Sequence, residues 1–303
     1  MSSISKGDIL AKSKTKADTK KTAKVLVTGA SGFLGLHLTR VLREAGLYVR
    51  SLGRLHSPTL EALGVDQRLG SVLDSEACLD AATDVDAVYH LAGMVSRSPE
   101  NASDMYTLHV QGVRNVLNAC QSALIDNILV VSTSGTVGVS ENPEFRGRED
   151  ALVPWSIISR WPYYESKAFA EKEVARFVER GLPVRIARPS LLLGPGDVKG
   201  GSTHDVVRFL CGHVQAALPG GLNFVDVRDV AAILPVLMDN GAPGVGYLLG
   251  GVNCSVREFL VALEQVSGVA APKLSVPRAL AKRGGLLRDT MSRLGGLDSQ
   301  TFD

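Results

Sequence analysis

Short apolar runs alternate along the chain with longer stretches in which apolar residues recur every three or four positions. The short runs predict buried strands, because a strand with both faces covered is apolar throughout. The longer stretches predict amphipathic helices. The predicted strands are 25–27, 48–52, 67–69, 87–90, 128–132, 184–188 and 247–249.

Helical patterns lie between the strands and after the last one. Strands that alternate with helices in this way pair in parallel and are joined by crossover helices. The pattern therefore predicts an α/β protein with a Rossmann-type, doubly wound parallel sheet. The principal predicted helices are 33–44, 102–123, 162–181, 227–239, 255–267 and 279–294.

Glycine and proline interrupt the pattern after residue 190. We interpret the interruption as the chain leaving a sheet domain that spans 24–190. It builds part of a small lobe at 191–221 and returns to the sheet at 222–250. Residues 251–303 then complete a small C-terminal substrate lobe.

Composition narrows the class of protein. The 303 residues are 45% hydrophobic and 21% charged, which are globular proportions. Basic and acidic side chains number 33 and 31, so we expect no nucleic-acid partner. Residues 1–23 contain six lysines and two aspartates but few large apolar side chains, and we predict a disordered basic tail there.

The four cysteines Cys78, Cys120, Cys211 and Cys254 lie far apart without the spacing of a zinc site. We expect buried thiols in a reducing compartment and no metal. The sequence has no apolar run of 18 residues, and its N-terminus lacks the apolar core of a secretory signal. These features predict no membrane span and a cytoplasmic location.

The segment TGASGFLG at 28–35 follows a predicted strand and precedes a predicted helix. Its first glycine allows a sharp turn, its second lets a pyrophosphate approach the backbone, and its third lets the helix lie close to the strand. The alternative is a turn whose glycines serve packing alone. We predict dinucleotide contacts from Gly29, Ser31, Gly32, Phe33, Leu34 and Gly35.

The end of the second strand indicates which dinucleotide is bound. A site selective for NAD carries a carboxylate there, whereas a site for NADP carries a guanidinium that binds the 2′-phosphate. This chain has Gly53 and Arg54 at that place. They predict NADP(H), with NAD as the alternative cofactor. The alternative for Arg54 is a surface arginine without a ligand.

Tyr163 and Lys167 lie four residues apart, on one face of the helix that begins at Pro162. Ser134 closes the fifth strand, whose carboxyl end opens onto the same crevice as the glycine loop. We predict that the lysine cation lowers the pKa of the phenol, which then exchanges a proton with a carbonyl oxygen held by Ser134. The alternative is a core tyrosine and a surface lysine. Tyr164 is a competitor, but Ala168 stands four residues after it.

From residue 24 to about 263 the chain resembles the extended short-chain dehydrogenase/reductase family, of the NAD-dependent epimerase/dehydratase type. It looks most like members related to dihydroflavonol reductase, 3β-hydroxysteroid dehydrogenase and hopanoid-associated sugar epimerases. The matching stretches are TGASGFLG at 28–35, HLAG at 90–93, VSTSGTVG at 131–138, YYESK at 163–167, ARPSLLLGPGD at 187–197 and FVDVRDVA at 224–231.

The resemblance implies roles for particular residues. Ser134, Tyr163 and Lys167 match the catalytic triad, of which Tyr163 and Lys167 also contact the cofactor, and Arg54 matches the arginine that reductases use for NADP. The remaining residues implied in cofactor binding are Leu91, Ala92 and Gly93 on the adenosine side, and Pro189 and Ser190 along the nicotinamide.

The chain departs from the family pattern at two places. Members carry an aspartate in the turn at residues 70–72, where this chain has none. Members also have an asparagine where this chain has His109. A buried histidine at that position is still able to form hydrogen bonds.

These features predict an NADP(H)-dependent oxidoreductase that reduces a ketone or aldehyde of a medium-sized, mostly apolar small molecule. One alternative is an NAD-dependent nucleotide-sugar epimerase or dehydratase, which uses the same triad and for which Arg208, Arg257 and Lys273 provide basic side chains in the lobe. Another is a non-catalytic NADP(H) sensor, although such sensors do not require the tyrosine and lysine found here. The sequence does not decide between a monomer and a homodimer.

Overall fold

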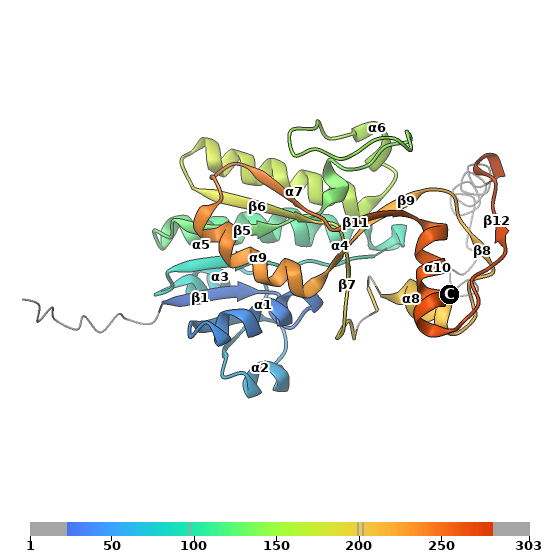
Figure 1. Cartoon of the computed structure of the whole chain (residues 1–303). Helices are drawn as coiled ribbons and strands as arrows, with labels where there is room; N and C mark the ends of the chain where they lie inside the picture. Colours follow the sequence, from blue (N-terminus) through green and yellow to red (C-terminus); the bar gives the residue numbers. More distant parts are fainter. Residues whose placement is uncertain (1–22, 97, 199, 202, 281–303) are drawn as a thin grey trace, which may run out of the picture.

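The computed structural model describes residues 23–280 apart from 97, 199 and 202 (Figure 1). The predicted tail 1–23 lies outside the described residues except for Ala23, whose carbonyl accepts a hydrogen bond from the Tyr48 amide. The predicted helix 279–294 also lies outside them, apart from its first two residues.

A seven-stranded sheet forms the centre of the molecule, in the order β10-β6-β5-β4-β1-β2-β3. All neighbouring strands in it pair in parallel. Strand order reverses on either side of β1, which makes a switch point at its carboxyl end. The predicted fold class is therefore confirmed. The strands are β1 Lys24–Thr28, β2 Tyr48–Gly53, β3 Asp66–Leu69, β4 Ala87–His90, β5 Asn127–Val131, β6 Val184–Pro189 and β10 Gly246–Leu249.

Helices cover both faces of this sheet (Figure 1). Helices α1 (Phe33–Glu44) and α9 (Val227–Asn240) pack on one another and bury one apolar core against the sheet. Helices α3 (Ser75–Ala82), α5 (Gly112–Ser122) and α7 (Pro162–Glu179) bury a second core on the other face. The shorter helical segments are α2 Pro58–Ala62, η1 Pro99–Asn101, α4 Ala102–Tyr106, η2 Thr107–Gln111, η3 Ser134–Thr136 and α6 Trp155–Ile158.

The first helix shows why the apolar pattern produces this packing. Leu34, Leu38 and Leu42 recur every four residues along α1, and all three are buried. This spacing places their side chains on one face of the helix. The glycine loop before α1 is thereby held against the end of β1.

A second, three-stranded sheet joins the sheet domain to the lobe. It contains β7 (Leu191–Leu193), β9 (Gly221–Asp226) and β11 (Val252–Ser255), in the order β11-β9-β7. We predicted that the chain returns to the main sheet from residue 222, but β9 belongs to this second sheet. Helix α9 packs on the main sheet, β10 joins that sheet, and Val225 of β9 lies in the same apolar core as α9. The aromatic ring of Phe224 in β9 stacks on Phe259, with ring centroids 4.2 Å apart, and so holds this strand toward the lobe.

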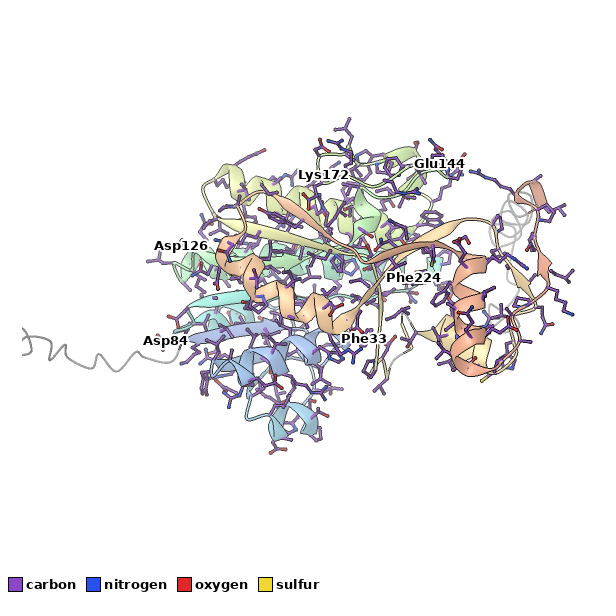
Figure 2. The ribbon with its side chains drawn as sticks, in the orientation of Figure 1. Phe33, Asp84, Asp126, Glu144, Lys172 and Phe224 are labelled. Carbon is purple, nitrogen blue, oxygen red and sulfur yellow. The ribbon has the colours of Figure 1, made fainter. Side chains whose placement is uncertain are left out.

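The small lobe lies beyond the carboxyl ends of the main-sheet strands (Figure 1). Figure 2 shows Phe33 at this end, whereas Asp84 and Asp126, which precede β4 and β5, lie at the opposite end. The crevice predicted at the carboxyl ends therefore faces the lobe. The lobe elements are α8 His204–Leu210, β8 Ala216–Ala217, α10 Val256–Ser267 and β12 Leu274–Ser275.

The cysteines differ in their burial. Cys78 and Cys120 are buried as predicted, but Cys211 is exposed and Cys254 is half-buried. Cys211 caps the carboxyl end of the seven-residue helix α8. Among the described residues, every helix is too short or too polar to span a lipid bilayer.

Candidate active site

The glycine loop is closely packed where the sequence predicts it. Gly29 has a φ of 73°, and a Cβ atom on it would lie 2.8 Å from the Ala92 nitrogen. A Cβ atom on Gly35 would lie 2.1 Å from the Gly29 carbonyl oxygen. Neither position has room for a side chain. Gly32 is different. A Cβ atom there would lie 3.1 Å from the Gly29 carbonyl oxygen and would have no other neighbour within 4 Å.

The N-terminus of α1 fits an anionic ligand. Gly32 caps the helix without a side-chain hydrogen bond, and the first turn contains no acidic residue. Helix N-termini attract phosphate through their N–H groups and positive dipole end. Ser31 is exposed beside them, and Phe33 is half-buried. The side chain of Leu34 lies in the core, so a phosphate contact at this residue requires its backbone N–H.

A hollow at the ends of β2 and β3 adjoins the glycine loop. Ser31, Gly53, Gln67 and Arg68 are among the residues that line it. Arg54 follows Gly53 directly and is exposed, so its guanidinium is accessible to a ligand at this edge. No carboxylate occurs in residues 48–54. This edge therefore carries one exposed guanidinium and, within residues 48–54, no carboxylate.

The segment after β4 is hydrogen-bonded to the glycine loop. The amides of Leu91 and Ala92 donate to the Thr28 carbonyl and hydroxyl at 3.1 and 3.2 Å. The Thr28 hydroxyl lies 2.7 Å from Nδ1 of His90, whose pKa burial and the Lys167 charge lower to about 3. The neutral ring of His90 carries one proton, and its tautomer decides whether Nδ1 or the Thr28 hydroxyl donates in this bond. Leu91, Ala92 and Gly93 thus lie beside the glycine loop.

The helix α7 brings the tyrosine and the lysine to the end of β5. Tyr163 is half-buried, and Lys167, one turn later, is buried and donates to the Val131 carbonyl at 3.0 Å. The Thr133 hydroxyl accepts from the Gly135 amide at 3.2 Å and acts on the Tyr163 phenol as a group that lowers its pKa. A hydroxyl, a phenol and an ammonium group therefore meet at the carboxyl edge of the sheet.

Thr133, which the sequence analysis did not select, is the hydroxyl residue that lowers the pKa of the phenol. Ser134 is half-buried and begins the short turn η3, where its carbonyl accepts from the amides of Val137 and Gly138. The sequence signal for Thr133 is the run of three hydroxyl residues at 132–134. Their order along the chain does not say which one faces helix α7. The role of Ser134 stays a prediction.

The expected lowering of the Tyr163 pKa is wrong for this arrangement. Burial raises the pKa of Tyr163, and the neighbouring Tyr164 adds to the rise, while the hydrogen bond from Thr133 opposes it. The ammonium of Lys167 is directed at the Val131 carbonyl. Burial lowers the pKa of Lys167 to about 8, and the carboxylate of Glu171 opposes this effect. The phenol is therefore protonated at neutral pH.

A buried ion pair extends from the same helix. Glu171 accepts two hydrogen bonds from the Arg188 guanidinium, at 3.1 and 2.8 Å, and one from the Thr136 hydroxyl at 3.0 Å. Arg188 also donates to the Glu149 carbonyl at 3.2 Å. The pair thus joins α7, β6 and the segment after η3. Sequence reasoning missed it, although Glu171 stands one helical turn after Lys167.

Pro189 and Ser190, predicted along the nicotinamide, follow Arg188 at the end of β6. Pro189 is buried, and the Ser190 amide donates to the Leu249 carbonyl at 3.0 Å. The bond fixes this segment to β10. Tyr164, the competitor of Tyr163, packs against Gly135, where a Cβ atom would lie 2.2 Å from its ring. We therefore assign Tyr164 a packing role.

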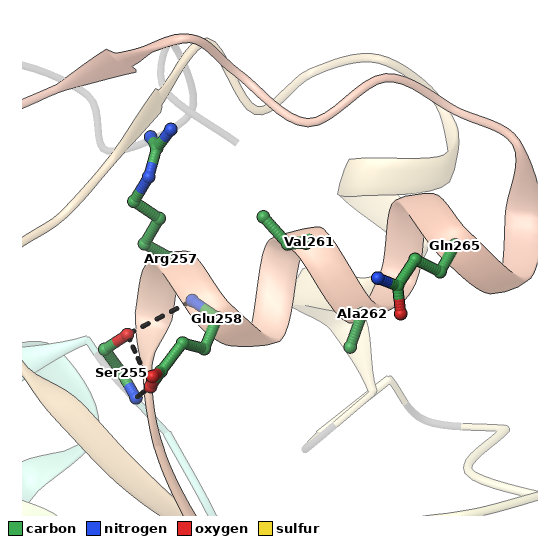
Figure 3. A pocket seen from close by; sticks show the side chains of 6 residues that line it. All are labelled: Ser255, Arg257, Glu258, Val261, Ala262 and Gln265. Carbon is green, nitrogen blue, oxygen red and sulfur yellow. Dashed lines mark hydrogen bonds between the residues drawn. The ribbon is translucent and has the colours of Figure 1, made fainter.

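The lobe contains a separate open hollow along α10 (Figure 3). Ser255 and Glu258 form a capping box at its edge, so the Glu258 carboxylate is occupied by the helix N-terminus. Arg257 donates to the Ser275 hydroxyl at 3.3 Å. Within the described part of the chain, no group of three or more histidine, cysteine or acidic side chains is arranged to hold a metal ion.

Comparisons with known proteins agree with this geometry. The model of the NAD dependent epimerase/dehydratase family matches residues 25–250. A sterol demethylase protein B of Methylococcus capsulatus is 32% identical over 274 residues, which cover 88% of this chain and 82% of the relative. A 3 beta-hydroxysteroid dehydrogenase/Delta 5-->4-isomerase of Mycobacterium tuberculosis is 27% identical over 283 residues, which cover 85% and 73%.

A solved structure of an epimerase has a similar fold. The UDP-glucose 4-epimerase of Thermus thermophilus, in complex with NAD, superposes with a TM-score of 0.70 at 25% identity. The match covers 84% of this chain and 86% of that one. The resemblance stated from the motifs is confirmed, because the family model covers most of the chain. The chain belongs to the NAD-dependent epimerase/dehydratase family and is an NAD(P)-dependent oxidoreductase.

Proposed function

We propose that the protein is an NADP(H)-dependent reductase of a ketone or aldehyde on a medium-sized, mostly apolar substrate. The observation that carries the proposal is the convergence at the end of β5 of Tyr163 and Lys167, one helical turn apart on α7, with the hydroxyl of Thr133. Bound nicotinamide supplies a hydride for the carbonyl carbon. Tyr163, protonated at neutral pH, donates its proton to the carbonyl oxygen.

Thr133 and Lys167 support the phenol in different ways. The Thr133 hydroxyl stabilises the phenolate that forms when the proton leaves, since its hydrogen bond lowers the pKa of Tyr163. Lys167 provides a positive charge on the same face of α7, and such a charge favours the phenolate. Together these groups favour proton transfer from a phenol that burial alone would hold protonated.

Thr133→Val should lower kcat about tenfold, because valine has the shape of threonine but cannot donate a hydrogen bond to a developing charge. It also removes the acceptor of the Gly135 amide, so the melting temperature is measured alongside kcat. Ser134→Ala is the matched comparison, because Ser134 is the other hydroxyl predicted to act here. If Thr133 alone supports the phenol, Ser134→Ala should change kcat less than about twofold. Both variants are compared with the unmodified protein in steady-state assays. A loss confined to Ser134→Ala would return the carbonyl-holding role to Ser134 and contradict the assignment of Thr133.

The preference for NADP(H) is supported by Gly53 and the exposed Arg54, with no carboxylate at the end of β2. Arg54→Ala should weaken NADPH binding about tenfold, the lower end for a hydrogen bond to a charged group, because the guanidinium is exposed. NADH binding should be unchanged. Fluorescence titration of both nucleotides measures this.

The control for the cofactor test is Arg40→Ala, which removes an exposed arginine from helix α1 of the same domain. It should leave the affinities for both nucleotides unchanged. Tighter binding of NADH than NADPH by the unmodified protein would overturn the NADP(H) proposal. It would then favour the epimerase or dehydratase.

An apolar substrate is supported by side chains near the lobe-facing edge and by the relatives. Val95, in the segment after β4, is 61% exposed, and Val207 of α8 is 53% exposed. The Methylococcus and Mycobacterium relatives are named for sterol and steroid substrates. Reduction of a panel of cyclic and aliphatic ketones with NADPH tests the reaction class.

The second candidate function is an NAD-dependent nucleotide-sugar epimerase or dehydratase. The similarity to the NAD complex of the Thermus epimerase favours it. So do Arg208, Arg257 and Lys273, which place basic side chains in the lobe. Conversion of a UDP-sugar without net consumption of nucleotide distinguishes this function from the reductase. Binding of NADP(H) without turnover of either substrate class would instead favour the sensor.

A further inference from the structure

His109 lies at the junction of the cofactor-binding segment and the catalytic helix. It belongs to η2, one turn of π-helix between α4 and α5, and only 1% of its surface is exposed. Short π-helical turns inside α-helices occur frequently at functional sites. These features make the contacts of the imidazole informative.

Both ring nitrogens of His109 have hydrogen-bond partners. The Met94 amide donates to Nε2 at 3.1 Å, so Nε2 carries no proton. Nδ1 lies 2.9 Å from the Ser166 hydroxyl and therefore donates to it. The Ser166 hydroxyl in turn donates to the Tyr163 carbonyl at 3.0 Å. One neutral tautomer satisfies every contact in this series.

The imidazole also contacts the groups that surround the reaction. Its ring meets the Tyr163 ring edge-on, with centroids 5.8 Å apart. A Cβ atom on Gly93 would lie 3.1 Å from Nε2 and 3.3 Å from the Lys167 ammonium. The side chains of His109 and Lys167 therefore both pack against Gly93. Gly93 belongs to the segment 91–93, which is predicted to contact the dinucleotide, so both side chains adjoin that segment.

The surroundings of His109 favour the neutral ring. Burial lowers its pKa, and the nearby Lys167 and His90 lower it further. A proton on Nε2 would remove the acceptor of the Met94 amide and place a second cation beside Lys167. The hydrogen-bond series and the local charges thus require the same protonation state.

We propose that His109 is a positioning residue that couples the cofactor-binding segment 91–94 to helix α7 through its two ring nitrogens. The Nε2 contact holds the backbone at Met94, and the Nδ1 contact holds Ser166 and, through it, the turn that carries Tyr163. The inference rests on the proposed function, because it assumes that a dinucleotide binds beside segment 91–94 and that Tyr163 transfers the proton.

Two variants separate the two contacts. The glutamine amide of His109→Gln reaches about as far as Nε2, whereas the shorter asparagine amide of His109→Asn reaches about as far as Nδ1. His109→Gln should keep the cofactor Kd within about twofold and lower kcat about five- to tenfold, the effect of one lost buried hydrogen bond. His109→Asn should raise the cofactor Kd about five- to tenfold and preserve kcat at saturating cofactor.

Two further variants serve as comparison and control. Ser166→Ala should lower kcat at least as much as His109→Gln, since it removes the acceptor of Nδ1 and also the donor to the Tyr163 carbonyl. His213→Gln replaces an exposed lobe histidine and should change neither parameter. The measurements are Kd by fluorescence titration and kcat at saturating cofactor, with NADPH or with whichever nucleotide the unmodified protein binds. Thermal melting of each variant accompanies them.

Opposite effects of asparagine and glutamine on Kd and kcat would support the proposal. Unchanged Kd and kcat in both variants would overturn it. Equal losses of both parameters in both variants, in step with lowered melting temperatures, would also overturn it, because they indicate a purely structural role. Failure of the proposed function is separate, since it is seen in the unmodified protein as a lack of reductase turnover. A lack of binding to either nucleotide would overturn both proposals.

Discussion

Tyr163→Phe is expected to lower kcat by about 10²- to 10⁴-fold, the usual contribution of a general acid. The substitution removes one oxygen atom and keeps the ring that packs edge-on against His109. The cofactor Kd and the melting temperature should therefore stay near those of the unmodified protein. Single-turnover assays measure the loss directly, because they separate the chemical step from product release.

Tyr164→Phe is the matched control for this substitution. It removes the same atom from the adjacent residue, whose ring packs against Gly135. We expect turnover close to that of the unmodified protein. If Tyr163→Phe kept full activity, or if the two variants lost equal activity, Tyr163 would not be the proton donor.

Lys167→Met is expected to lower kcat about 10- to 100-fold, in line with the loss of a charge-assisted interaction. It should also change the pH profile. Burial lowers the pKa of Lys167 to about 8, so the ammonium group loses its proton as the pH rises through that value. Activity that depends on the cation should fall above about pH 8 in the unmodified protein and lack this basic limb in the variant.

The informative measurement for Lys167→Met is kcat as a function of pH at saturating cofactor. Lys172→Met removes another lysine of the same helix, whose ammonium lies over the Trp155 ring, and should keep the basic limb. Full activity of Lys167→Met with an unaltered profile would show that Lys167 has no part in the reaction.

The parts of the site that the sequence predicts well are those set by local geometry. The glycine loop depends on a strand, a turn and a helix that are adjacent in the chain, and the contacts around Gly29 and Gly35 agree with it. Tyr163 and Lys167 share a helix face because of their spacing alone. No distant contact is needed for either inference.

Other parts of the site depend on how distant elements meet. The choice of Thr133 depends on which hydroxyl the end of β5 presents to α7, and the positions in the run do not contain that information. His109 acquires its partners from segment 91–94 and from Ser166, far from it in the chain. The pKa of Tyr163 rises because packing buries the phenol, which spacing does not reveal.

In the fold, too, the features set by local sequence are predictable, whereas those set by contacts between distant elements are not. Alternating strands and helices predict the parallel sheet, because crossover connections permit few arrangements. The place of β9 in the second sheet could not be predicted in this way, since it involves pairing with β7 and β11 and the stacking of Phe224 on Phe259. The residues of an apolar strand do not indicate which of two sheets the strand joins.

The uncapped start of α1 has a consequence for the amount of folded protein. Gly32 offers no side chain to the first turn, and no acidic residue balances the positive end of the helix dipole. A dinucleotide phosphate bound there satisfies these groups in the folded state only. By mass action, a ligand at 100 times its Kd adds about 2.7 kcal/mol to the free energy of unfolding. Resistance of the folded protein to proteolysis is therefore expected to increase with the concentration of the cofactor.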